Sequence, residues 1–180
     1  MVKKTGVTIV AVVEDQQLER FVRRALGALG FDRHEIYVRS NYPKRGSGSG
    51  KRYVEQQYRK EIVTLRRKSR ENRALLLGKQ TVDARVRVLD KQVEDIGQAR
   101  RDSGERIVYW IPKRHVETWG LHLTGVSVDE ATDYHHRGDS IDWRRAGGGF
   151  HAEYLKFRNG AASPLPSLNQ AYQETQRLKL

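Results

Sequence analysis

The sequence predicts an α/β protein with a mostly parallel sheet, helices on both faces of the sheet and a C-terminal helical appendage. Two observations lead to this fold class. Four short apolar runs alternate with segments of helical periodicity over the first 111 residues. The first run, at residues 7–13, is apolar except for one threonine, which is typical of a strand buried on both faces of a parallel sheet. The order β-α-β-α-β-α-β then favours crossovers that place helices on both faces.

Four strands and three intervening helices follow from the apolar spacing. The strands are predicted at residues 7–13, 35–38, 74–77 and 106–111. The helices are predicted at 18–29, 54–65 and 82–96, where apolar residues recur every three or four positions on one face. Gly30 is expected to end the first helix, and Pro112 to stop the fourth strand.

The second half is thinner in apolar residues, so we expect residues 1–125 to form the α/β domain and residues 126–180 to form a loop and helix appendage packed on it. Short helices are predicted at 115–123 and 129–136, followed by a polar loop at 138–149 that contains three consecutive glycines. A last helix is expected after Pro166, with Ser167 as its cap.

The composition excludes several classes of protein. The 180 residues include no cysteine, which rules out disulfides, thiolate zinc sites, iron–sulfur clusters and cysteine nucleophiles. The longest apolar run is far too short to span a membrane, and no small-residue cleavage site follows it. We therefore expect a cytoplasmic protein that does not associate with membranes.

Positive charge is concentrated in one segment. The chain carries 34 Lys and Arg against 22 Asp and Glu, a net charge of +12, and residues 39–73 hold twelve of these basic residues and only three acidic ones. Such a field attracts polyphosphates, which favours DNA or RNA as partner, although a solvated helix that aids solubility is the alternative. The candidate nucleic-acid-binding residues are Lys44, Arg45, Lys51, Arg52, Arg59, Arg66, Arg67, Lys68, Lys113 and Arg114.

The glycine- and serine-rich stretch 46–50 precedes Lys51 and only superficially resembles a nucleotide-binding phosphate loop. Lys51 is followed by Arg52 rather than by Ser or Thr, and the glycine spacing differs from that of the phosphate loop. We interpret the stretch as a basic loop that contacts a nucleic-acid backbone.

Polar residues of interest follow the predicted strands, because function in parallel sheets collects at the carboxyl ends of strands. The acidic pair Glu14-Asp15 after the first strand resembles that of response-regulator receivers. The receiver fold needs an aspartate at the end of its third strand, where this chain has Leu77-Gly78-Lys79-Gln80. The receiver interpretation is therefore disfavoured.

A closer resemblance is to Toprim proteins, in particular to the nuclease half of overcoming-lysogenisation-defect systems and to the small RloB-like and DUF4276-like defence-associated proteins. Glu14 matches the glutamate that ends the first Toprim strand. Residues 111–119 look like the segment of the small proteins in which proline is followed by Glu-x-Trp, here Pro112 and Glu117-Thr118-Trp119. Residues 166–168, with Glu174 and Arg177, look like their closing helix.

The resemblance implies a Toprim/Rossmann-like sheet and phosphodiester chemistry assisted by Mg²⁺ or Mn²⁺. It also implies a nuclease, or a nuclease-derived subunit, of a prokaryotic anti-phage or anti-plasmid system that works with an ATPase or another defence protein. The catalytic candidates are Glu14 and Glu117, and the metal-binding candidates are Glu14, Asp15 and Asp83. Oligomeric state and partner identity stay open.

The sequence departs from the Toprim pattern at the third strand. Toprim enzymes place Asp-x-Asp there, whereas this chain continues with residues 78–81, Gly-Lys-Gln-Thr. Either the site is rebuilt from Glu14, Asp83 and Glu117, or the domain binds nucleic acid without cutting it, and the missing carboxylates favour the second alternative. Glu117 itself has a structural alternative, as a helix cap or as a partner of Lys113 or Arg114.

The stretch Asp133-Tyr134-His135-His136 suggests a metal site by composition alone. Adjacent residues on a helix point about 100° apart, so neighbouring histidines rarely bind one ion together. We therefore interpret both histidines as exposed polar residues.

Overall fold

The computed structural model describes residues 6–40, 50–68, 70–80 and 86–180. Its sheet has four strands, β1 (Thr8–Val13), β2 (Ile36–Arg39), β3 (Arg73–Gly78) and β4 (Ile107–Trp110), in the order β2-β1-β3-β4. Every neighbouring pair is parallel. The predicted α/β fold is confirmed.

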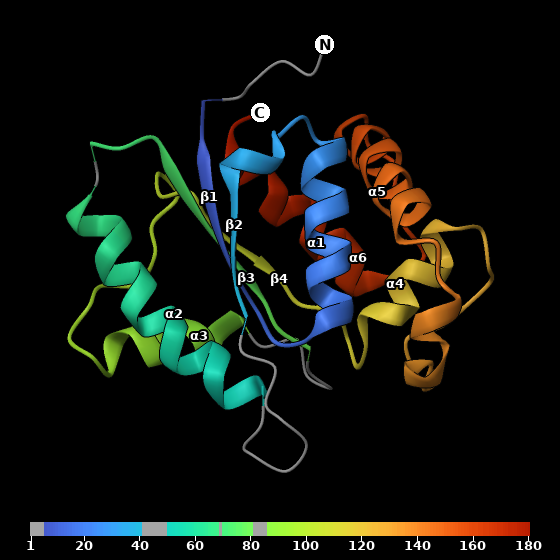
Figure 1. The fold of residues 1–180 in the computed structure, drawn as a ribbon, viewed down its shortest axis with the longest axis horizontal. Coiled ribbons are helices and arrows are strands. Elements are labelled where there is room, and N and C mark those ends of the chain that lie inside the picture. The colour runs from blue at the N-terminus through green and yellow to red at the C-terminus, as the bar shows by residue number, and fades with distance from the viewer. Residues whose placement is uncertain (1–5, 41–49, 69, 81–85) are drawn as a thin grey trace.

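Helices cover both faces of the sheet (Figure 1). One face carries α1 (Gln16–Ala28), α4 (Val116–Leu123), α5 (Trp143–Arg158) and α6 (Pro166–Thr175), and the other carries α2 (Gly50–Arg67) and α3 (Val86–Glu94). Two short 3-10 helices of the described residues, η1 (Arg33–Glu35) and η2 (His135–Ser140), lie in connections, and a third, η3 (Gln176–Leu178), follows α6.

Strand periodicity divides the core into two clusters. Alternate residues of β1 point to opposite faces, so Ile9, Ala11 and Val13 pack with α1 and α5, whereas Val10 and Val12 pack with α2. The larger cluster is rich in aromatic rings, which join its segments: the Phe21 ring of α1 lies 5.9 Å from Trp110 of β4 and 5.6 Å from Phe150 of α5 between centroids. The C-terminal segment thus contributes to the core of the α/β domain.

The prediction for residues 129–149 is wrong. Turns and η2 occupy the place of the helix predicted at 129–136, and α5 begins inside the stretch predicted as a loop. Two of the three glycines that suggested a loop are packing positions in α5: a Cβ at Gly147 would lie 2.6 Å from the Arg24 carbonyl carbon of α1, and one at Gly149 would lie 2.5 Å from Leu123 O. Close approach of two helices therefore accounts for them.

The cap predicted for the last helix also differs. The N-cap of α6 is Leu165, and Pro166 occupies its first turn. Ser167 donates hydrogen bonds from its backbone N–H and its hydroxyl to Glu130 Oε1, at 2.9 and 2.5 Å. Its side chain thus links α6 to the preceding loop.

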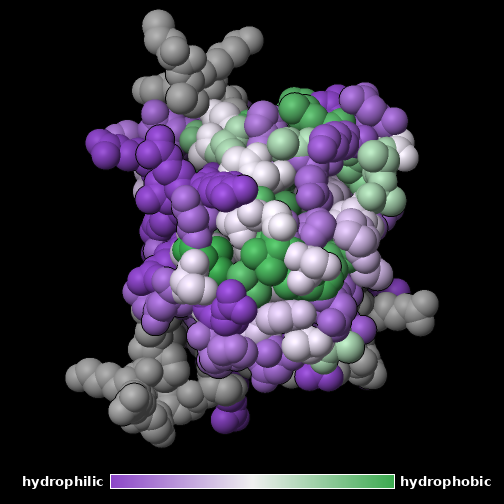
Figure 2. All heavy atoms as spheres, turned by 90° about the vertical axis from the view of Figure 1, so that its right-hand side faces the viewer, coloured by the Kyte–Doolittle hydropathy of each residue, from purple (hydrophilic) through white to green (hydrophobic). Residues whose placement is uncertain are grey.

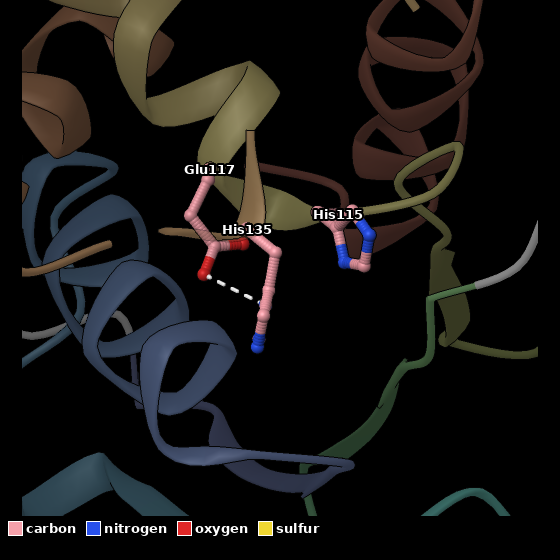
Figure 3. Close-up of side chains that lie close together, drawn as sticks. All are labelled: His115, Glu117 and His135. Atoms are coloured by element: carbon pink, nitrogen blue, oxygen red, sulfur yellow. Dashed lines mark ion pairs between the residues drawn. The ribbon is translucent and has the colours of Figure 1, made fainter. Parts of the chain in front are cut away.

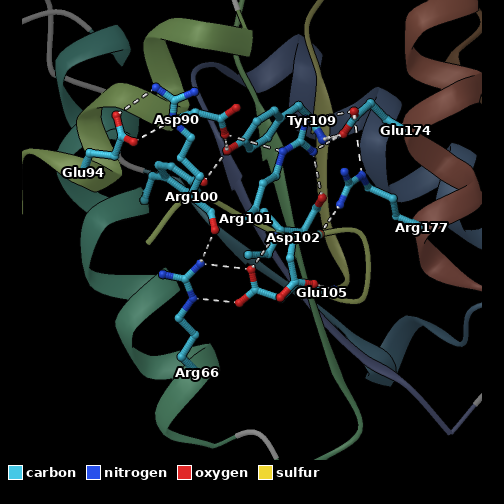
Figure 4. A network of polar contacts seen from close by, with 12 residues as sticks. Arg66, Asp90, Glu94, Arg100, Arg101, Asp102, Glu105, Tyr109, Glu174 and Arg177 are labelled. Carbon is cyan, nitrogen blue, oxygen red and sulfur yellow. Dashed lines mark hydrogen bonds and ion pairs between the residues drawn. The ribbon is translucent and has the colours of Figure 1, made fainter. Parts of the chain in front are cut away.

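A buried polar network seals the β4 edge of the sheet (Figure 4). Glu174 of α6 accepts a 3.0 Å hydrogen bond from the backbone N–H of Tyr109, a donor on an edge strand. The Arg101 guanidinium donates to Glu174 and lies 3.6 Å from the centroid of the Tyr109 ring. The Tyr109 hydroxyl donates to Asp90 of α3 at 3.0 Å. The network joins α3, β4 and α6.

The side of the molecule that carries α5 is mostly polar. Figure 2 shows the side that lies to the right in Figure 1, where hydrophilic residues surround a hydrophobic band near the middle. Among the described residues, no helix is both long and apolar enough to cross a membrane.

Candidate functional site

The carboxyl ends of β1, β3 and β4 lie at one edge of the sheet, where α1 and α4 begin (Figure 1). We call this the carboxyl edge. It carries Glu14 and Asp15 after β1, Lys79 and Gln80 after β3, and residues 111–117 after β4. The parallel order thus brings together most of the segments that the sequence indicates.

Gln80 ties three of these segments together. Its backbone N–H donates to Glu14 Oε2 at 2.9 Å, and its side-chain amide donates to Asp15. The amide oxygen accepts a 2.8 Å hydrogen bond from the Val116 N–H at the start of α4. Asp15 also caps α1 by accepting from the Leu18 N–H at 2.8 Å. Both carboxylates after β1 therefore have structural partners.

The magnesium site implied by the Toprim resemblance does not fit the end of β3. Magnesium prefers oxygen ligands in octahedral geometry. The buried Lys79 places an ammonium group there, 2.5 Å from Glu55 Oε1 of α2, and Gln80 follows it. Asp83, the third predicted ligand, lies outside the described residues. Glu14 and Asp15 are thus the only predicted metal ligands that the described residues bring together.

Glu117 lies in the first turn of α4, and its side chain is only 2% exposed. Its Oε2 atom has no hydrogen-bond partner among the described residues. Burial raises the pKa of this carboxyl group to about 7, and the nearby charge of Asp15 adds to the rise. In the described structure its ion pair is with His135, not with Lys113 or Arg114, and the N-cap of α4 is His115.

Two histidines face Glu117 (Figure 3). His135 Nδ1, on η2, lies 3.6 Å from Glu117 Oε1, and the rings of His115 and His135 lie 5.0 Å apart between centroids. One ligand atom from each of the three side chains lies within 4.8 Å of the others. We call His115, Glu117 and His135 the histidine–glutamate cluster.

Asp133 connects the two histidines of the cluster. Its Oδ1 atom lies 3.4 Å from His115 Nε2 and accepts a 2.9 Å hydrogen bond from the His135 N–H. The His135 side chain is 68% exposed, in agreement with its sequence-based interpretation, but it reaches a buried carboxylate many residues away along the chain. No local periodicity links positions that far apart, and only the turn between α4 and η2 brings them together.

The basic segment spans the molecule instead of forming one patch. The helix α2 begins at the carboxyl edge and runs back along the sheet (Figure 1). Lys51 and Arg52 lie in its first turn, whereas Arg66 and Arg67 lie in its last. A helix rises 1.5 Å per residue, so Arg52 and the end of α2 at Arg67 are separated by roughly 22 Å. We call the other end of the sheet, where its parallel strands begin, the amino edge.

Some basic residues of this segment form ion pairs with glutamates. Arg66 Nε lies 2.7 Å from Glu105 Oε1, at the margin of the network in Figure 4, and this hydrogen bond raises the arginine pKa. Lys68 Nζ lies 3.3 Å from Glu71 Oε1 on the surface. Arg67 is exposed, and Lys44 and Arg45 lie outside the described residues.

Two arginines among the predicted nucleic-acid-binding residues have a buried donor atom without an acceptor in the described structure. The Nε atoms of Arg59 on α2 and Arg114 after β4 are buried and have no hydrogen-bond partner in the described part of the chain. Arg114 also has a left-handed backbone with φ 63°, a conformation that costs free energy outside glycine. Together with its neighbour Lys113, Arg114 places positive charge in the segment between β4 and α4.

Two cavities lie away from the carboxyl edge. One, of about 490 Å³, opens at the amino edge and is lined by Arg66, Arg70, Arg73 and Arg106 among others. The second, of about 580 Å³, lies beside α1 and α5 and is lined by Arg23, Arg24, Arg33 and Arg144 around Phe31 and Ile36. Arginine therefore lines pockets on several sides of the molecule.

Comparison with known proteins gives no relative: no protein-family model, no curated protein and no solved structure matches this chain.

Proposed function

We propose that this protein is a nucleic-acid-binding subunit, and that it binds the phosphate backbone across the carboxyl edge. The observation that carries the proposal is the net charge of +12, together with the positive groups that flank this edge: Arg52, Lys113 and Arg114. Lysine and arginine side chains form charge-assisted hydrogen bonds with phosphate oxygens.

The end of β3 favours binding without magnesium-dependent cleavage. Lys79 and Gln80 stand where the Toprim resemblance requires carboxylates, and Gln80 engages both Glu14 and Asp15. A buried, paired cation and an amide at this position do not supply the oxygen ligands that magnesium prefers.

Metal-assisted cleavage of a phosphodiester is the second candidate function. It is favoured by Glu117, a buried carboxylate with an unpartnered oxygen in the described structure, beside two histidines. In this alternative Glu117 and Glu14 are the catalytic residues.

The cellular role we propose follows from the Toprim resemblance. It is that of a cytoplasmic subunit of a prokaryotic anti-phage or anti-plasmid system, acting with an ATPase or another defence protein.

Salt-dependent binding tests the main proposal. Fluorescence anisotropy with labelled single-stranded DNA, duplex DNA and RNA is expected to show affinity that falls linearly with salt on logarithmic axes, with a slope of about −0.9 per phosphate contact on duplex DNA. Binding that is absent at low salt, or that is insensitive to salt, would overturn the proposal.

Incubation of the same substrates with Mg²⁺ or Mn²⁺ separates the two candidates. Binding without cleavage supports the main proposal. Cleavage by the wild type that is lost in both Glu14→Ala and Glu117→Gln supports the second candidate.

A further inference from the structure

We propose that His115, Glu117 and His135 bind one divalent transition-metal ion such as Zn²⁺. This site differs from the magnesium site that the Toprim resemblance implies, both in its residues and in the ion that they suit. It goes beyond the proposed function, because the ion can bind whether or not nucleic acid is cut.

The three ligands come from two segments held in place by backbone interactions. His115 is the N-cap of α4, and Glu117 follows in the first turn. His135 begins η2, where its N–H is held by the Asp133 carboxylate at 2.9 Å. The geometry suits a tetrahedral ion: at bond lengths near 2.1 Å, two ligand atoms lie roughly 3.4 Å apart. Glu117 Oε1 and His135 Nδ1 are 3.6 Å apart.

The remaining ligand pairs lie within 4.8 Å, so the cluster must contract slightly around an ion. His135 is able to supply this movement because its side chain is largely exposed. Asp133 is the positioning residue, since it contacts His115 Nε2 and the His135 backbone. Carboxylates commonly orient metal-binding histidines in this way.

An ordinary ion pair between Glu117 and His135 does not account for the cluster. A buried carboxylate is costly unless both of its oxygens have partners, and Oε2 has none among the described residues. A divalent ion in front of Glu117 would compensate the buried charge, and an exposed histidine on one side does so only in part.

The 3-10 helix η2 packs closely against the Glu117 carboxylate. Gly138 of η2 lies against it, and a Cβ at that position would be 3.0 Å from Glu117 Oε1 and 2.7 Å from Gln17 Nε2. Any larger residue at position 138 would press on the carboxylate. Glycine therefore lets η2 approach closely enough to present His135.

The donor set selects the class of ion. Imidazole nitrogens suit Zn²⁺ and its first-row neighbours, whereas Mg²⁺ prefers an all-oxygen set and keeps most of its water. A site with two histidines and one carboxylate also leaves a coordination position open for water or a phosphate oxygen. The site would thus suit a protein that binds a polyphosphate at the same edge.

Metal binding is tested on the full chain without nucleic acid, so its outcome is independent of the proposed function. After treatment with a chelator, the protein is titrated with Zn²⁺ by calorimetry and with Co²⁺ by visible absorption. We expect one equivalent of either ion to bind, with a Co²⁺ spectrum that indicates nitrogen ligands. A large excess of Mg²⁺ should not displace the ion.

Three variants locate the site. His135→Ala and Glu117→Gln are each expected to weaken binding at least about tenfold, whereas His136→Ala, the neighbouring histidine, should bind like the wild type. Zn²⁺ should raise the melting temperature of the wild type and of His136→Ala, but not of His135→Ala, because a ligand stabilises only the state that binds it.

The same titrations contain the outcomes that would overturn the site. These are no binding by the wild type, equal binding by His135→Ala and the wild type, or equal loss in His136→Ala. The exposed position of His135 makes its replacement compatible with folding, which circular dichroism checks.

Discussion

At the scale of single residues, Glu117 combines features that rarely serve stability. Its carboxylate is almost fully buried, one oxygen lacks a hydrogen-bond partner in the described structure, and Asp15 adds negative potential. Burial of an ionised group costs free energy that a neutral group of the same shape avoids. The fold therefore holds this charge at a cost, which is expected of functional groups.

This cost should depend on pH. The Glu117 pKa is raised from 4.5 to about 7, so between these values the unfolded state loses a proton that the folded state retains. The free energy of unfolding should therefore fall as pH rises, by up to about 3 kcal/mol from this group. Glu117→Gln removes the effect, and its stability relative to the wild type should grow between pH 4.5 and about pH 8.

Urea unfolding in the presence of a chelator measures this difference at both pH values. Asp95→Asn, which neutralises an exposed carboxylate at the end of α3, is the control and should show little change. A constant difference between Glu117→Gln and the wild type across this range would contradict the prediction.

Arg101 provides the opposite case, a buried charge with full compensation. Its side chain is 6% exposed and pairs with Glu174. Arg101→Ala would leave the buried Glu174 carboxylate with the Tyr109 N–H and a 3.9 Å contact to Arg177 Nε as its remaining partners, which should lower the free energy of unfolding by about 3 kcal/mol. Its neighbour Arg100 forms an exposed pair with Glu94, and Arg100→Ala should cost less than about 1 kcal/mol. Chemical denaturation of the two variants compares them directly, and similar losses would contradict the argument.

At the scale of elements, strands and helices were predictable where the spacing of apolar residues in the sequence matches the residues that the fold buries. The buried run of β1 and the apolar face of α1 are both local patterns, and the structure confirms them. The helix α5 was missed because the rule that glycine favours loops is also local. Nothing near Gly147 in the sequence indicates that the Arg24 backbone lies against it. The contact of His135 with Glu117 was not predictable from the sequence for the same reason, since Glu117 lies on α4.

The three glycines of α5 should therefore respond differently to alanine. A Cβ at Gly148 would point into open space, with no neighbouring atom within 4 Å, so Gly148→Ala should stabilise the protein by up to about 1 kcal/mol through helix propensity. Gly147→Ala would clash with the Arg24 backbone and should destabilise it by about 1–3 kcal/mol. Thermal unfolding distinguishes the two, and equal shifts in the same direction would show that α5 does not pack as described.

At the scale of the whole molecule, the direction of α2 decides how the positive charge is used. The sequence places most of the excess charge in one segment, but a helix of 18 residues carries it from one edge of the sheet to the other. Screening in physiological salt limits the reach of each charge to about 8–10 Å. Groups at the two edges therefore act on separate ligands, or on separate parts of one long ligand.

Charge reversal at the two edges tests which of them binds nucleic acid. The pair Arg52→Glu with Lys113→Glu alters the carboxyl edge, and the pair Arg67→Glu with Lys68→Glu alters the amino edge by the same change in net charge. If phosphates bind at the carboxyl edge, the first pair should weaken binding at least about tenfold and reduce the salt slope by about 2, since each lysine or arginine contact contributes about 1. The second pair should change affinity less than about threefold.

A larger loss of affinity from the second pair would instead indicate that the binding surface lies at the amino edge, where Arg70, Arg73 and Arg106 line a cavity of about 490 Å³. Equal losses would show that the field of the whole molecule, rather than either edge, holds the nucleic acid.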